Sequence, residues 1–451
     1  FYAYGEPKVI WLLLVSCLVS YYAGIFMEKF PKYRKALLLL AILVEFGFLV
    51  YYKYAGFFLD IARNFVDVPY LRVVMPIGIS FFTFQTMSYV ADVYMGKVQV
   101  AHSLLDYSTY VCLFPQLVAG PIVRYSDVAI ELETRTHSYD QFGYGVKRFI
   151  IGLGKKVLLA NMLGELVDVL TGLPVSVLSY WVQAIAYAMQ IFFDFAGYSD
   201  MAIGLGSIFG IKFPENFNYP FIAKSVTEFW RRWHMTLSGW FRDYVYIPLG
   251  GNRKGNIRTY VNVFIVFLIS GLWHGASWNF VFWGACHGIF MVITRAFKKF
   301  FDRLHPVFNW ILTFSFVNVM WVFFRAENFS QALTLLKALV SWNFSFDNTF
   351  IEIFRFAELK KVLSFVRVEE RYPAFLITAF FAVSFVLLLG SENAYEKMQK
   401  FKPNFWRFMI TLFLFTWCVF SFAGISEFNL DRVKELTDRL GLPCYIEEAA
   451  W

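Results

Sequence analysis

The stretch Leu268–Gly288 reads LISGLWHGASWNFVFWGACHG and places two histidines, His274 and His287, in a run that is otherwise aromatic, aliphatic or very small. It lies within Thr259–Thr294, which is long enough for two membrane-spanning helices. Small residues at Ser270–Ser277 interrupt the run and let other groups approach the backbone closely. The stretch therefore predicts a spanning segment that is split by a break, with an imidazole at the break.

The whole chain has the composition of a membrane protein. Apolar residues make up 58% of the 451 residues and charged residues only 16%, which leaves more apolar surface than a water-soluble fold can hide. We expect an all-α, polytopic membrane protein with about ten to twelve membrane segments. Apart from the split segment, the candidate spans are Val9–Phe26, Ala36–Tyr52, Val73–Met95, Val175–Tyr198, Val307–Phe324, Pro373–Gly390 and Phe408–Gly424.

The formal net charge of +8 reports membrane topology rather than nucleic-acid binding, because the basic residues lie in loops between apolar segments. Such loops are expected on the cytoplasmic side, which places the N-terminus outside. The loop residues are Lys29, Lys32, Arg34 and Lys35; Arg295, Lys298, Lys299 and Arg303; and Lys397, Lys400, Lys402 and Arg407.

The centre of the chain, Met75–Gly288, is rich in proline and glycine, which break helices. In lipid, a broken helix is tolerated only where protein or a water-filled cavity satisfies the freed backbone groups. The sequence therefore predicts a cavity within this central region.

One part of the centre, Lys224–Arg258, carries seven Lys or Arg residues against two acids, with aromatic residues between them. It could be an amphipathic helix in the membrane interface, with its rings at the headgroup level. It could also be a re-entrant element that lines a cytoplasmic funnel and attracts an anionic cofactor. On a helix, His234 would share a face with apolar residues rather than with the arginines, which favours the second interpretation.

The remaining histidines differ in their surroundings. His274 could be a structural residue bonded to a neighbouring helix, but an ionisable residue at membrane depth is functional by default, and imidazole can accept and return a proton. We expect His287 to pack, and His102, His137 and His305 to be solvated. No GxSxG nucleophile elbow, HExxH motif or Cys/His ligand spacing is present, so the sequence predicts metal-free, histidine-based proton transfer.

Four segments resemble the membrane-bound O-acyltransferase family, and within it the bacterial alginate O-acetyltransferase branch. They are FPQLVAGPIVRY (114–125), DFAGYSDMAIGLGSIFGIKFPENFNYPF (194–221), FWRRWHMTLSGWFRDYVYIPLGGNR (229–253) and the split stretch itself. The resemblance implies roughly eleven transmembrane helices with re-entrant elements around a central tunnel. We expect a transmembrane domain at residues 1–425, with its catalytic core at about 75–294, and an amphipathic tail at 426–451 that docks an extracytoplasmic partner.

By the same resemblance, His274 is the catalytic histidine and His234 the second functional one. Acetyl-CoA would enter from the cytoplasm, and the acetyl group would pass across the bacterial inner membrane to a polysaccharide acceptor through a partner protein. Because coenzyme A is polyanionic, the basic aromatic element is its expected binding site. The candidate cofactor-binding residues are Arg231, Arg232, Trp233, Arg242 and Trp230, and the further structural or lining residues within the matched motifs are Asp194, Tyr198 and Asn216.

Two other functions compete with this one. D-alanyl transfer from a carrier protein to teichoic acid belongs to the same superfamily, and a transporter would also have broken helices around intramembrane ionisable groups. The sequence leaves open whether His234 orients the donor or acts as a second base. It also leaves open whether a covalent acyl-enzyme forms, for which Cys286 is the candidate.

Overall fold

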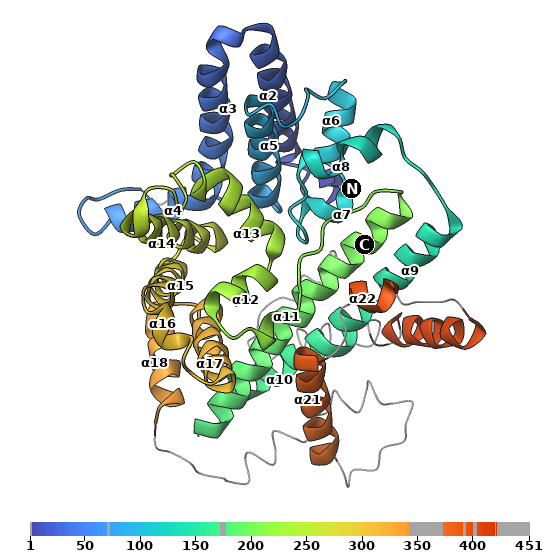
Figure 1. The fold of residues 1–451 in the computed structure, drawn as a ribbon, viewed down its shortest axis with the longest axis vertical. Coiled ribbons are helices and arrows are strands. Elements are labelled where there is room, and N and C mark those ends of the chain that lie inside the picture. Colours follow the sequence, from blue (N-terminus) through green and yellow to red (C-terminus); the bar gives the residue numbers. More distant parts are fainter. Residues whose placement is uncertain are drawn as a thin grey trace. The chain divides into compact units, whose positions relative to one another are not determined.

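All secondary structure in the described part of the chain is helical, which confirms the predicted all-α fold (Figure 1). The computed structural model describes residues 2–69, 73–171, 177–341, 373–390, 394–399, 404–419 and 421. The predicted tail at 426–451 lies outside these residues.

Contacts within the chain divide it into two units. Unit 1 comprises Phe1–Phe149 and Tyr198–Val340, and unit 2 comprises Ile150–Gly197 and Ser341–Trp451. Both candidate catalytic histidines lie in unit 1.

The N-terminal part of unit 1 is a group of packed helices. The helix α3 (Arg34–Leu49) passes through a π-helical turn, η2 (Val50–Tyr54), into α4 (Ala55–Ala62), so the helical segment extends ten residues beyond the predicted end at Tyr52. The neighbouring helices are α2 (Ile10–Lys29), α5 (Ile79–Tyr94), α6 (Leu104–Val111), α7 (Phe114–Leu117) and α8 (Tyr125–Glu133).

The split segment folds as predicted into two helices that pack side by side, α14 (Gly255–His274) and α15 (Trp278–Ala296) (Figure 1). Glycines allow their backbones to meet. A Cβ added at Gly271 would lie 2.2 Å from the carbonyl oxygen of Phe280, and one at Gly284 would lie 2.4 Å from that of Phe267. The hairpin therefore depends on main-chain contact between its two halves.

The second half of unit 1 continues with helices that flank this hairpin. The basic aromatic element forms α12 (Val226–Arg232), α13 (Met235–Phe241) and the π-helical turn η5 (Arg242–Tyr246), and not one continuous helix. The hairpin is followed by α16 (Lys298–Phe301), α17 (Pro306–Arg325) and α18 (Phe329–Leu339).

Unit 2 contains the central part of the chain together with the C-terminal helices. An ion pair of 2.5 Å joins Lys156 to Asp194, one of the residues expected to be structural or lining. Helices α9 (Tyr139–Gly154) and α11 (Val177–Ile208) contain residues of both units, and the other helices described in unit 2 are η3 (Lys155–Ala160), α10 (Asn161–Thr171), α21 (Pro373–Gly390), α22 (Ala394–Gln399) and Phe405–Val419.

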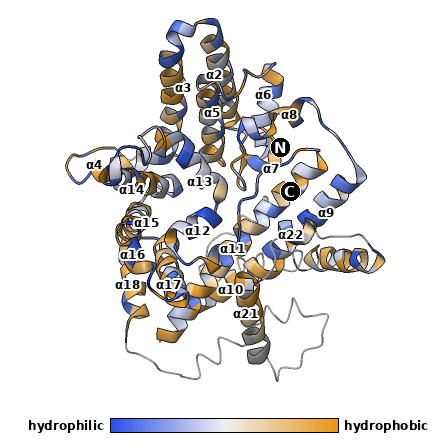
Figure 2. Cartoon of the chain, viewed as in Figure 1, coloured by the Kyte–Doolittle hydropathy of each residue, from blue (hydrophilic) through white to orange (hydrophobic). Residues whose placement is uncertain are grey.

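Within the described residues, four helices are long and apolar enough to cross a membrane. Figure 2 shows hydrophobic residues along α2, α3 and α17 and a more hydrophilic segment at α12. The expected total of about eleven spans stays a prediction. The four helices are Ile10–Lys29, Pro31–Ala62, Gly255–His274 and Pro306–Arg325.

Candidate functional site

His274 is the last residue of α14, and aromatic rings surround its imidazole. The ring centroids of Trp283 and Phe324 each lie 5.2 Å from that of His274, in edge-on arrangements. The ring centroid of Trp273, the preceding residue, lies 5.0 Å from that of His274. As a whole residue, His274 is only partly buried.

His234 occupies the junction between α12 and α13 and is 1% exposed. Its backbone is left-handed, with φ 44° and ψ 55°, a conformation that costs a non-glycine residue roughly 1–2 kcal/mol. Its Nδ1 lies 2.9 Å from Oδ1 of Asn216, and the backbone N–H of Met235 donates to the Asn216 carbonyl at 2.9 Å. Asn216 therefore holds the junction through both its side chain and its main chain.

The break at His234 corrects the prediction of a helix that runs through it. The expected apolar environment is nevertheless confirmed, because Trp230, Leu237 and Phe241 are buried with it. The physical reason is tertiary: the segment around Asn216 pairs with the backbone of the junction, which a continued helix could not allow.

The structure brings the two candidate catalytic histidines close to the same indole ring, that of Trp273. The centroid of the Trp273 ring lies 6.4 Å from that of His234 and 5.0 Å from that of His274. Two histidines forty residues apart in the sequence therefore lie close to one another in the fold.

His287, for which we expected a packing role, is 1% exposed. Its Nδ1 accepts a 3.2 Å hydrogen bond from the indole N–H of Trp230, and its ring lies 4.5 Å from that of Trp283. Because Trp283 in turn contacts His274, His287 supports the wall of the site without reaching its centre.

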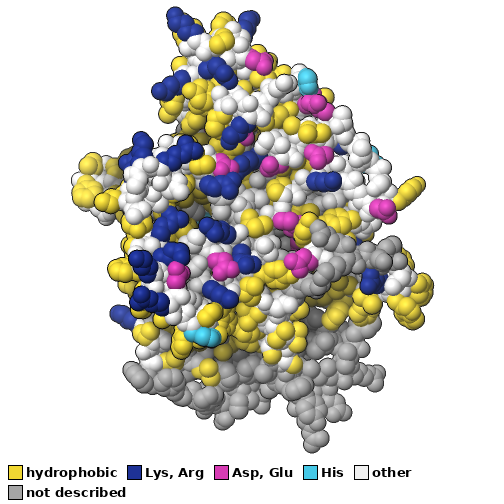
Figure 3. Space-filling view, viewed as in Figure 1, with side chains coloured by type: hydrophobic (Ala, Val, Ile, Leu, Met, Phe, Trp, Pro, Cys, Tyr) yellow, Lys and Arg dark blue, Asp and Glu magenta, His cyan; other side chains and the backbone are white. Residues whose placement is uncertain are grey.

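A basic cavity of about 450 Å³ lies in unit 1 between the start of α12, the end of α15, and α16 and α17. Its cationic lining residues are Lys224, Arg231, Arg295 and Lys298, against a single carboxylate, Asp302. Figure 3 shows Lys and Arg side chains concentrated over the region of α12 to α16, with fewer acids among them. The arrangement suits a polyanion.

A second, more apolar cavity of about 220 Å³ shares Thr227, Arg231 and Arg295 with the first. It extends along α14 to Ser270, which is four residues, or about one helical turn, from His274. Leu237, three residues after His234, also lines it. The two cavities together lead from a cationic mouth toward both histidines.

Of the five residues predicted to bind the cofactor, three line the cavities and two do not. Trp230, Arg231 and Arg242 line the cavities. Arg232 instead pairs with Glu228 at 2.9 Å, and Trp233 is buried, stacked on Phe229.

Sequence reasoning missed three lining cations. Arg295 and Lys298 were interpreted only as topology signals, and Lys224 was counted only in the total charge of its element. Arg295 and Lys298 reach Arg231 because the α14–α15 hairpin returns the chain to this region, whereas Lys224 lies just before α12.

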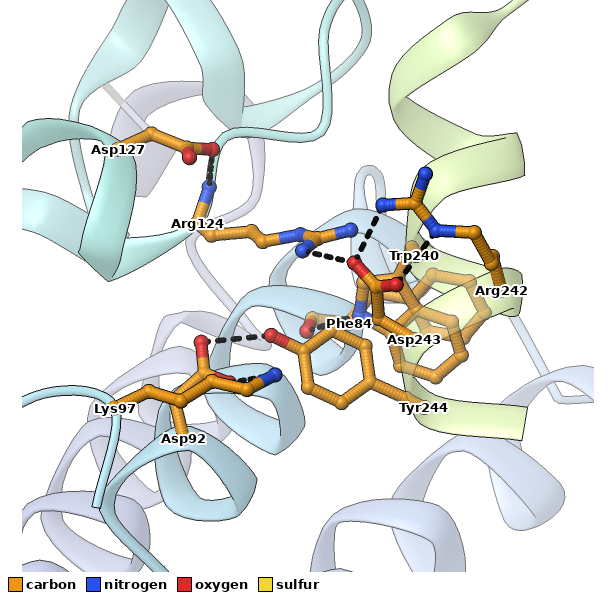
Figure 4. Close-up of polar contacts among 9 residues, drawn as sticks. All are labelled: Phe84, Asp92, Lys97, Arg124, Asp127, Trp240, Arg242, Asp243 and Tyr244. Atoms are coloured by element: carbon orange, nitrogen blue, oxygen red, sulfur yellow. Dashed lines mark hydrogen bonds and ion pairs between the residues drawn. The ribbon is translucent and has the colours of Figure 1, made fainter. Parts of the chain in front are cut away.

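A second polar cluster anchors η5, and Figure 4 shows it. The carboxylate of Asp243 accepts hydrogen bonds of 2.7 Å from Arg124 and 2.7 and 3.0 Å from Arg242. Partial burial alone would raise the pKa of Asp243, but the bonds from the two arginines outweigh it and lower that pKa. Asp243 thereby orients Arg242, whose side chain is 65% exposed at the cavity.

The same turn is tied to α5 by two further contacts (Figure 4). The phenol of Tyr244 donates to Asp92 at 2.7 Å, and Lys97 lies 3.4 Å from the same carboxylate. The indole of Trp240 stacks on Phe84 with ring centroids 3.7 Å apart and donates to its carbonyl at 3.0 Å. These contacts fix the cavity wall to the N-terminal helices.

In the part of the chain that the structure describes, no group of three or more His, Cys, Asp or Glu residues is arranged to hold a metal ion. Tyr198, which we expected to be structural, packs against Gly120.

Comparison with known proteins connects this site to a family. The model of the membrane-bound O-acyltransferase family matches residues 97–329, which include both histidines and all residues of the two cavities. The chain belongs to the membrane-bound O-acyltransferase family. It is therefore an O-acyltransferase and a multi-pass membrane protein, and the transporter interpretation is set aside.

Individual relatives support the same assignment. The chain is 40% identical to the probable alginate O-acetylase AlgI of Pseudomonas aeruginosa, over 85% of this chain and 74% of the relative. It is 36% identical to a peptidoglycan O-acetyltransferase of Helicobacter pylori, over 76% of this chain and 72% of the relative. It is 30% identical to a teichoic acid D-alanyltransferase of Bacillus subtilis, over 56% of this chain and 69% of the relative.

Proposed function

We propose that this O-acyltransferase takes acetyl from acetyl-CoA on the cytoplasmic side of a bacterial inner membrane and passes it outward for O-acetylation of a cell-surface polysaccharide. The observation that carries the proposal is the pair of adjacent cavities, one cationic and one apolar, which share Thr227, Arg231 and Arg295, and of which the apolar one reaches Ser270 and Leu237, four and three residues from His274 and His234. Residues 1–425 form the transmembrane domain in this proposal, and its catalytic core is residues 75–294.

The two parts of acetyl-CoA, its charged phosphates and its less polar pantetheine arm, suit the cationic and the apolar cavity in turn. The phosphates of coenzyme A suit the cavity of Arg231, Arg295 and Lys298, because arginine forms bidentate bonds to phosphate oxygens. The less polar pantetheine arm suits the adjoining cavity, which brings the thioester toward Ser270 and Leu237. Arg295 and Lys298 also belong to a loop expected to be cytoplasmic, which supports entry from that side.

His274 acts as the base in this proposal. It removes the proton from an acceptor hydroxyl as the oxygen attacks the thioester carbonyl, so that a C–O bond forms and the C–S bond breaks. The departing CoA thiolate takes a proton, and the histidine can return the one that it removed. We assign His234 to hold the donor, because Leu237 and Ser238, on the next turn, line the apolar cavity.

The acceptor follows from the relatives. Alginate and peptidoglycan are named for two of them, and both carry hydroxyl groups outside the cytoplasm. We propose an alginate-like exopolysaccharide or another surface glycan as the final acceptor, reached through an extracytoplasmic partner protein that docks on the 426–451 tail. Deleting that tail should abolish co-purification of the partner, and glycan acetylation that persists without it would refute the docking role.

The experiment that tests the donor is turnover of acetyl-CoA by purified protein in lipid nanodiscs, measured as release of the CoA thiol. The wild-type protein should release CoA, and His274→Ala should lose release while it keeps its melting temperature and its binding of acetyl-CoA. The matched control is His137→Ala, which changes an exposed loop histidine and should release CoA normally. Transfer of D-alanyl from a carrier protein, with no consumption of acetyl-CoA by the wild type, would overturn the proposal.

A further inference from the structure

Lys53 places a cationic side chain within the apolar helical segment Pro31–Ala62, which is long enough to span a membrane. Its Nζ donates a 2.8 Å hydrogen bond to the hydroxyl of Ser80 in α5 and a second hydrogen bond to the carbonyl of Trp273 in α14. We propose that Lys53 is a positioning residue that orients His274 by holding the main chain where α14 ends. The inference rests on the proposed role of His274 as the base.

The carbonyls at the end of α14 need partners because the helix stops. In a continued helix, Leu272 and Trp273 would accept from the N–H groups of residues 276 and 277, four positions on. The chain leaves the helix after His274, so those donors are lost. The ammonium group of Lys53 replaces the lost donor at the carbonyl of Trp273. The phenol of Tyr54 replaces the lost donor at the carbonyl of Leu272, with a hydrogen bond of 2.7 Å.

The charge of Lys53 also suits this position. A helix C-terminus carries partial negative charge from its free carbonyls, which favours a nearby cation. The Nζ lies 5.5 Å from the centroid of the Trp273 ring and 6.0 Å from that of Tyr54, so both aromatic faces contribute. In the described part of the chain Lys53 enters no ion pair, and the helix end and the two rings are among its electrostatic partners.

The π-helical turn η2, between α3 and α4, brings the side chains of Lys53 and Tyr54 to the end of α14. Neighbouring residues of a regular α-helix do not face the same target. Lys53 and Tyr54 are the last two residues of the π-helical turn η2, and both reach consecutive carbonyls of α14. Single π-helical turns occur frequently at functional sites.

The consequence concerns the reaction itself. His274 is joined directly to Trp273, so the clamp on that carbonyl sets the direction in which the imidazole leaves the helix. A displacement of about 1 Å in a catalytic group can cost roughly 100-fold in rate. Lys53 acts on the base and contacts none of the residues that line the donor cavities, so its loss should lower kcat and leave the KM for acetyl-CoA unchanged.

The test compares Lys53→Met with Lys53→Arg in the nanodisc assay of CoA release. Lys53→Met should lower kcat by roughly 10- to 100-fold, with KM for acetyl-CoA within about threefold of wild type. Lys53→Arg, which keeps a cation that can donate to both oxygens, should recover at least part of that loss. Tyr54→Phe, which removes only the bond to Leu272, should lower kcat by a smaller factor and gives a second measurement if Lys53→Met does not fold.

The matched control is Lys35→Met, an exposed lysine at the start of α3, which should behave as wild type. Wild-type kcat in both Lys53→Met and Tyr54→Phe would overturn the inference, and so would an increase in KM as large as the decrease in kcat. A wild-type protein that consumes no acetyl-CoA would instead refute the proposed function, so the two failures are distinguishable.

Discussion

Arg124 donates a 2.7 Å hydrogen bond to the carboxylate of Asp243, which lies 119 residues further along the chain. Both side chains are largely buried, at 17% and 14% exposure. This bond connects η5, which carries Arg242 to the donor cavity, with the start of α8.

The first prediction is that Arg124→Gln destabilises the protein. Removing one partner of a charge-assisted bond in a mostly buried place should lower the free energy of unfolding by about 1.5–3 kcal/mol. Thermal unfolding in detergent measures the loss. The control is Arg63→Gln in the more exposed Asp60–Arg63 pair, for which a cost of less than about 1 kcal/mol is expected. Equal melting temperatures for the two variants would contradict the prediction.

The second prediction concerns pH. The pKa of Asp243 is lowered in the folded state by its two arginine partners, so its stabilising effect is complete above the unfolded-state value of about 3.9 and is lost as pH falls through the folded value. The difference in melting temperature between wild type and Asp243→Asn should therefore stay constant from neutral pH down to about pH 5 and shrink only below about pH 4. A difference that disappears near pH 6 would show that another group controls it.

The third prediction separates two adjacent arginines. Arg231 lines both cavities, whereas Arg232 is paired with Glu228. Arg231→Gln should raise the KM for acetyl-CoA by roughly 10- to 100-fold, the equivalent of one or two charge-assisted bonds to phosphate. Arg232→Gln should change it by less than about threefold, which is under 0.7 kcal/mol. If the two variants have the same KM, the basic cavity is not the phosphate site.

The fourth prediction uses the left-handed backbone of His234. Asparagine tolerates this conformation better than alanine does, so His234→Asn should keep a melting temperature close to wild type, while His234→Ala should lower it. If His234 holds the donor, the asparagine variant should raise the KM for acetyl-CoA by about tenfold, or about 1.4 kcal/mol. A variant with unchanged KM and a strongly reduced kcat would instead identify His234 as a second base.

The fifth prediction tests the helix hairpin. Gly271→Ala would place a methyl group 2.2 Å from the carbonyl oxygen of Phe280, and the backbones would have to separate at a cost of about 1–3 kcal/mol. Gly47→Ala, near the C-terminal end of α3, meets no atom within 4 Å and should be neutral or stabilising. Melting temperatures measured in the same detergent distinguish the two variants. A Gly271→Ala variant with the melting temperature of the wild type would show that the helices can shift without cost.

The sequence predicted the parts of the fold that composition determines directly. Apolar length and small residues located the split segment, and α21 has the predicted bounds Pro373–Gly390. The break at His234 could not be predicted, because no glycine or proline stands there and the cause is a backbone contact with Asn216. Long-range pairing of this kind leaves no local signal.

Lys53 shows a different reason for a missed residue. The predicted span ended at Tyr52, one residue before Lys53, whereas the structure continues the helical segment to Ala62. The lone lysine in FGFLVYYKYAGFFL was the available signal, because a cation retained in such a run needs a specific partner. Its partner, the carbonyl of Trp273, is 220 residues away and only the fold reveals it.

The main-chain contact between Gly271 and Gly284 has a consequence for how the protein responds to its lipid environment. Ser270 and Met291, which line the apolar cavity, stand on the same hairpin as His274. A bilayer of different thickness changes the tilt of spanning helices at modest cost. Because the backbones of the two halves are in contact, such a tilt would move His274 together with the part of the cavity wall that the hairpin supplies.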